Sequence, residues 1–171
     1  MFNKLKSNHL ERALEKEFKA KQILRLVKKD FQLDYFGQHG IIHWSNVLRN
    51  CNKIASHYNI SSSFFELFSL IHDSQRDDEI EDYAHGPNAS IFCKKLKDKG
   101  LLNLSKELYQ TLEFTCYHHS SLRPGQTDNI LVKICIDADR LDLSRYGLRI
   151  KEELLFTDYA KVLANKINAE R

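Results

Sequence analysis

The scarcity of chain-breaking residues is the feature that most constrains this fold. Six glycines and two prolines occur in 171 residues, and both residue types interrupt helices. Between them, apolar residues recur at three- and four-residue steps, the spacing of an amphipathic helix. No segment shows the alternation of a half-buried strand. The sequence therefore predicts an all-α fold, a single-domain helical bundle of about six or seven helices.

The expected helices are separated by loops rich in glycine, serine or acidic residues. They cover approximately residues 5–29, 41–58, 64–71, 87–99, 104–118, 129–143 and 151–168. Ser63 and Glu66 have the spacing of a capping box, and Gly100 suits a helix C-terminus. Residues 64–71 are apolar on almost every side, which predicts a short helix buried at the centre of the bundle.

The composition is that of an ordinary soluble protein. We expect a main domain over residues 31–171, with a basic amphipathic helix over residues 1–30 packed on it. No apolar run approaches the roughly 20 residues needed to cross a bilayer, and the first residues lack the apolar core of a signal peptide. A cytoplasmic protein without membrane association is therefore expected.

The first 30 residues hold nine Lys or Arg against four Asp or Glu, a charge of +5 in a chain whose net charge is +3. Such an arm could contact nucleic acid or an anionic membrane. A solvated helix face explains the same charge, and no aromatic interleaving or nucleic-acid motif accompanies it. Nucleic acid is therefore not an expected partner.

Several histidines and acids point toward the apolar core. His43 lies at the edge of an apolar stripe, and His72 ends the most apolar helix, with Asp73 directly after it. Asp139 lies one turn after Cys135 in a mostly apolar helix. A buried carboxylate is costly unless another group neutralises it. These positions therefore need a neutralising partner.

A bound cation is one such partner. Imidazole nitrogens and carboxylate oxygens together suit manganese, iron, cobalt, nickel or zinc, and magnesium less well. Helices of a bundle can direct such ligands into its core. Structural roles explain the same residues: each histidine could be a satisfied core residue, Asp73 could close the following loop, and Asp137 or Asp139 could pair with an arginine.

Five segments of the chain resemble the HD-domain metal-dependent phosphohydrolases and follow that family's order. They are GIIHWSNVL around His43, FSLIHDSQRDD around His72 and Asp73, HGPNAS at His85, HHS at His118 and His119, and DADRLDLSRYG around Asp139. Together they span about residues 40–147. The HD doublet alone occurs by chance, whereas the doublet with its flanking histidines and the DADRLDL segment is specific. The pattern HDSxR…HGP is similar to that of small bacterial HD-domain proteins.

The resemblance implies that one divalent metal ion is bound by a conserved set of four side chains in that family. In this sequence they match His43, His72, Asp73 and Asp139. Asp137 is the rival of Asp139. The second acid of the family's segment is usually the ligand, and Asp139 shares a helix face with Cys135 while Asp137 lies opposite.

Further positions match family residues that contact substrate phosphate or a second metal. His85 is one, and His119 is preferred over His118 because it lies nearer the centre of its helix's apolar face. Arg76 could bind a phosphate through its planar guanidinium or pair with the acidic loop that follows it. Arg123 is a weaker candidate for the same role.

The resulting hypothesis is a metal-dependent phosphohydrolase that cleaves a phosphate ester, for example of a nucleotide, with a metal-activated water. Its catalytic residues would be Asp73, His85, His119 and Arg76. The kind of ester stays open, but the absence of the Gly-Tyr-Pro triplet argues against cyclic-di-GMP. Two alternatives remain: a non-catalytic nucleotide- or metal-binding sensor module, and an RNA-associated or partner-docking helical protein.

Overall fold

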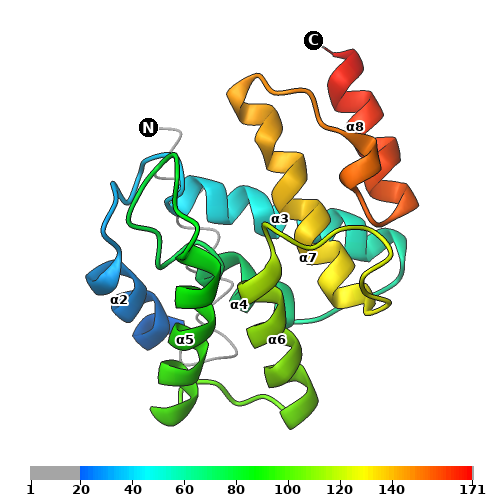
Figure 1. The fold of residues 1–171 in the computed structure, drawn as a ribbon. Coiled ribbons are helices and arrows are strands. Elements are labelled where there is room, and N and C mark those ends of the chain that lie inside the picture. Colours follow the sequence, from blue (N-terminus) through cyan, green and yellow to red (C-terminus); the bar gives the residue numbers. More distant parts are fainter. Residues whose placement is uncertain (1–19, 171) are drawn as a thin grey trace.

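The computed structural model describes residues 20–170, which fold entirely into helices and loops (Figure 1). The α-helices are α2 (Ala20–Asp30), α3 (Ile41–His57), α4 (Phe64–Ile71), α5 (His85–Asp98), α6 (Lys106–His118), α7 (Ile130–Asp142) and α8 (Asp158–Ala169). Two short 3-10 helices, η1 (Leu143–Tyr146) and η2 (Glu152–Leu154), follow α7. No strand occurs in this part of the chain, so the all-α prediction is confirmed.

Helix α4 is the centre of the bundle, as its apolar sequence predicts. It contacts α2, α3, α5, α6 and α7, and Phe64, Phe65 and Phe68 are all buried. Two closely packed helix pairs, α3 with α7 and α5 with α6, lie against it (Figure 1). The C-terminal end of α4 therefore points His72 and the residue after it to the junction of the two pairs.

Helix α2 joins the main core through Ile23 and Val27, which are fully buried, while Lys28 and Lys29 are exposed. It is the last part of the helix expected over residues 1–30, and residues 1–19 lie outside the described residues. None of the helices in residues 20–170 is long and apolar enough to cross a membrane.

The start of α4 differs from the prediction. Ser63 has helical dihedral angles and makes no capping hydrogen bond. Instead, the Ser62 hydroxyl accepts a hydrogen bond from the Phe64 N–H at 3.2 Å. The capping box of Ser63 with Glu66 therefore does not form, because the helical turn already includes Ser63.

The last helix is shorter than predicted. Residues 151–157 form η2 and an extended segment, and α8 begins at Asp158. The Thr157 hydroxyl accepts a hydrogen bond from the Ala160 N–H and donates one to Asp137 at 2.7 Å. Asp137 also accepts from the N–H groups of Phe156 and Thr157. A buried acid on α7 thus fixes where α8 begins.

Candidate metal centre

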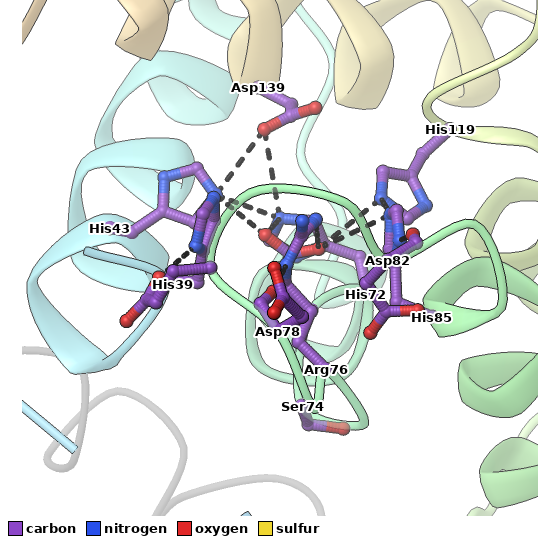
Figure 2. Close-up of polar contacts among 12 residues, drawn as sticks. His39, His43, His72, Ser74, Arg76, Asp78, Asp82, His85, His119 and Asp139 are labelled. Carbon is purple, nitrogen blue, oxygen red and sulfur yellow. Dashed lines mark hydrogen bonds and ion pairs between the residues drawn. The ribbon is translucent and has the colours of Figure 1, made fainter. Parts of the chain in front are cut away.

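Four histidines and two aspartates meet where the two helix pairs join (Figure 2). They are His43 on α3, His72 and Asp73 after α4, His85 at the start of α5, His119 after α6, and Asp139 on α7. Figure 2 shows His43 on one side of this group and His85 with His119 on the other. All six were predicted site residues, and the fold brings them together.

The first cluster contains the four residues predicted as metal ligands. His43 Nε2 lies 3.1 Å from His72 Nε2, 3.3 Å from Asp73 Oδ2 and 3.3 Å from Asp139 Oδ1. His72 Nε2 lies 3.8 Å and 3.7 Å from the same two oxygens. Four potential ligand atoms therefore face one small volume.

The second cluster uses the other oxygen of the same aspartate. His85 Nε2 and His119 Nε2 are 3.0 Å apart, and they lie 3.7 Å and 3.4 Å from Asp73 Oδ1. Arg76 Nη1 lies 3.6 Å from the same oxygen. Asp73 therefore bridges the two clusters, with Oδ2 facing the first and Oδ1 facing the second.

Each imidazole is oriented through its other ring nitrogen. Nδ1 contacts an oxygen in all four histidines, so Nδ1 donates a proton there and Nε2 faces the cluster. The backbone carbonyls of Phe68, Asp82 and Cys116 accept from His72, His85 and His119 respectively. This arrangement presents two Nε2 atoms to each cluster.

His43 differs because a carboxylate accepts its Nδ1–H. Asp142 Oδ2 lies 2.7 Å from His43 Nδ1, and Asp142 Oδ1 accepts from Asn46 at 2.9 Å. Arg145 Nε lies 2.7 Å from Asp142 Oδ2. The sequence analysis missed Asp142. The available signal was its position three residues after Asp139, which places both acids on one helix face.

Asp73 shows most clearly that the cluster suits a cation. Its side chain is 5% exposed, and Oδ1 has no hydrogen-bond partner within the described chain. Burial opposes the charge, but His72, His119 and His43 hold the pKa of Asp73 well below its usual range. The carboxylate is therefore ionised in a place where an unneutralised charge is costly.

The pKa values of the histidines also follow from these contacts. Burial disfavours the imidazolium of His43, but Asp139, Asp142 and Asp73 raise its pKa well above the usual value. Burial likewise opposes the charge of His119, but the carboxylate of Asp73, whose Oδ1 lies 3.4 Å from Nε2, raises its pKa. Burial and the nearby His119 lower the pKa of His85. The aspartates thus favour positive charge on His43 and His119, as they would favour a bound metal ion.

The donor atoms fit divalent metal ions. Two imidazole nitrogens 3.0–3.1 Å apart need a proton or a cation between them. Metal–nitrogen bonds are about 2.0–2.1 Å long, so both nitrogens of a pair can reach one ion. Two groups could each hold an ion: His43, His72 and Asp73, with Asp139 beside them, and Asp73, His85 and His119.

The sequence left two choices, between two aspartates of α7 and between two adjacent histidines, and the structure places the members of each pair in different surroundings. Asp139 faces the cluster, whereas Asp137 is buried and holds the start of α8. The side chain of Asp139 is 22% exposed, more than expected, because it borders a cavity. His119 is 2% exposed and reaches the second cluster, while His118 packs against neighbouring aromatic rings.

A cavity of about 280 Å³ lies beside the clusters. Four arginines line it, Arg76, Arg123, Arg140 and Arg145, together with Leu143, Tyr146 and Leu154. His39, which contacts Glu79 of the loop after α4, also lines it. Periodicity could not have assigned Arg140, Arg145 or His39 to this cavity, because their positions depend on how the helices pack.

Comparisons with known proteins agree with this geometry at the level of the fold. No family model matches the chain, and no curated protein matches its sequence. Among solved structures, it is similar to a predicted HD superfamily hydrolase from an uncultured Thermotogales bacterium, with 21% identity and a TM-score of 0.66. The similarity covers 88% of this chain and 85% of that one. The chain therefore shares the fold of that structure, an all-α fold such as its sequence motifs predict.

Proposed function

We propose that the protein is a metal-dependent phosphohydrolase that cleaves a phosphate ester of a small molecule such as a nucleotide. One observation carries the proposal: Asp73 bridges two pairs of histidines beside a cavity bordered by arginines. The description of the similar structure as a predicted HD superfamily hydrolase supports hydrolysis. Phosphate is inferred from the guanidinium groups, whose planar donors match phosphate oxygens.

The metal ions would be held by the two histidine–aspartate groups. A divalent ion there lowers the pKa of a water molecule and stabilises charge on a phosphoryl oxygen. Manganese, iron, cobalt, nickel or zinc suits these donors better than magnesium. The chain itself must then position the attacking water and the substrate.

Asp73 and Arg76 are suited to that positioning. Asp73 is fixed directly after the buried helix α4, so its oxygens can orient a water molecule between the clusters. Arg76 Nη1 lies 3.6 Å from Asp73, and its Nε donates to the Asp78 carbonyl at 3.3 Å. These contacts hold the guanidinium at the edge of the cavity, where its remaining N–H groups can bind phosphoryl oxygens.

His85 and His119 are better suited to holding an ion than to proton transfer. The Nε2 of His85 lies 3.0 Å from His119 Nε2 and 3.7 Å from Asp73 Oδ1. Protonation of the leaving oxygen by His85 would instead need its Nε2 directed at the substrate. We therefore place both histidines in a second ion site.

The proposal is tested with Asp73→Ala and a control from the same loop, Asp77→Ala, whose side chain is exposed. Each protein is stripped of metal, reloaded with manganese or cobalt and assayed on p-nitrophenyl phosphate and a panel of nucleotides. Asp73→Ala should lose both metal and phosphate release, and Asp77→Ala should keep both. Unchanged metal content and activity in Asp73→Ala would contradict the mechanism. Tight nucleotide binding without phosphate release by the wild-type protein would favour the sensor alternative.

A further inference from the structure

Two of the four cavity arginines have no carboxylate within ion-pair distance in the described part of the chain. Arg76 pairs with Asp73, and Arg145 pairs with Asp142. Arg123 and Arg140 instead donate their hydrogen bonds to backbone carbonyls. Their positive charges therefore lack the direct neutralisation that the other two arginines have.

These two guanidinium groups converge on one atom. Arg123 Nη1 donates to the carbonyl oxygens of residues 120–122, at 3.4, 3.1 and 3.3 Å. Arg140 donates through Nη2 to the carbonyl of Leu122 as well, and through Nη1 to that of Leu154. Both cations thus lie within hydrogen-bond reach of the Leu122 oxygen.

Such an arrangement costs electrostatic energy, which Asp139 and Asp137 offset on the Arg140 side without forming an ion pair. Like charges repel, and the repulsion is larger where water is partly excluded. Arg140 is buried and tied to two loops, so it cannot swing into solvent. An anionic ligand between the two groups would remove this cost.

The arginine pair lies beside the metal centre. Arg140 directly follows Asp139 on α7, and both arginines line the same cavity as the two clusters. Successive residues of a helix point about 100° apart, so Arg140 is not aimed at the point that Asp139 faces. Arg76 already lies next to Asp73 for the phosphoryl group at the centre. The pair is therefore available to a different part of the substrate.

We propose that Arg123 and Arg140 form a subsite for a second phosphate group of the substrate, which makes the preferred substrate a small bisphosphate. This inference rests on the proposed function, because it places the second group relative to a phosphoryl group cleaved at the metal centre. The fork geometry of guanidinium groups suits phosphate, and the cavity of about 280 Å³ holds more than one phosphate group.

Binding of non-hydrolysable probes tests the subsite without relying on turnover. Alkane-α,ω-bisphosphonates of increasing length are titrated into the metal-saturated protein and compared with alkyl monophosphonates of the same length. At least one bisphosphonate should bind about 10- to 100-fold more tightly than its monophosphonate, since a charge-assisted hydrogen bond contributes roughly that factor. Arg123→Ala should abolish this advantage. Arg149→Ala, an exposed arginine outside the cavity, should keep it.

Each outcome distinguishes the subsite from the catalytic proposal. The subsite is wrong if no bisphosphonate gains affinity, or if the gain persists in Arg123→Ala. Hydrolysis of p-nitrophenyl phosphate without any bisphosphonate advantage would keep the phosphohydrolase and remove the subsite. An advantage that depends on Arg123, in a protein that hydrolyses no phosphate ester, would keep the subsite and remove the enzyme.

Discussion

The two sides of the candidate metal centre hold their histidines by different means. On the α3–α7 side, His43 donates to the carboxylate of Asp142, and Asp139 adds a second acid at the cluster. On the α5–α6 side, His85 and His119 donate to neutral backbone carbonyls. A carboxylate acceptor makes an imidazole a stronger ligand. Two similar ligand sets can therefore differ in metal affinity because of the groups that accept hydrogen bonds from their histidines. We expect the α3–α7 side to bind its ion more tightly.

Removing one histidine from each side should have the largest effect. His43→Ala should weaken binding of the first ion by about 100-fold or more, because it removes a ligand from the tighter site. His85→Ala should keep the tight ion and lose the second. Calorimetric titration with manganese, together with elemental analysis, measures both. Equal losses in the two variants would mean that the sides do not differ.

Replacing Asp142, which accepts the hydrogen bond from His43 Nδ1, should have the next largest effect. Asp142→Asn keeps the shape but removes the charge, and it should weaken the tight ion by about 10- to 100-fold. The second ion should bind as in the wild type, and Asp142→Glu should restore part of the loss. If both ions weaken together, Asp142 acts on the fold rather than on His43.

The pH dependence of metal affinity should also differ between the two sides, by less than the effects of the substitutions above. Because the pKa of His43 is raised well above its usual value, this imidazole must release a proton before Nε2 can bind metal. Affinity for the tight ion should therefore fall by up to about tenfold per pH unit below that pKa. The dependence should extend to higher pH than for the second ion, because the pKa of its ligand His119 is raised less far and that of His85 is lowered. Titrations in buffers of different ionisation enthalpy count the protons released.

The smallest effect on metal binding is expected from a buried acid outside the clusters. Asp137→Asn should lower the free energy of unfolding by about 1–3 kcal/mol, because three hydrogen bonds to the start of α8 lose a charged acceptor. Affinity for both ions should stay within about twofold. Denaturant unfolding measures the first quantity. A large loss of metal affinity would give Asp137 a role in the centre.

The sequence predicted what depends on local periodicity. Helical spacing located α4 as the central element, and helix faces together with the family motifs favoured His119 over His118 and Asp139 over Asp137. What it missed depends on distant contacts. The start of α8 is set by Asp137, about 20 residues earlier in the chain. The convergence of Arg123 and Arg140 depends on a shared backbone oxygen that no pattern of side chains records.

The place of Asp73 in the chain has a mechanical consequence. It follows the most buried helix directly, and its two oxygens face ligands carried by separate helix pairs. A loaded centre would therefore act as a crosslink, in which relative movement of the α3–α7 and α5–α6 pairs stretches metal–ligand bonds. Metal binding should suppress this relative movement. The two helix pairs should then unfold together in one sharper, cooperative thermal transition.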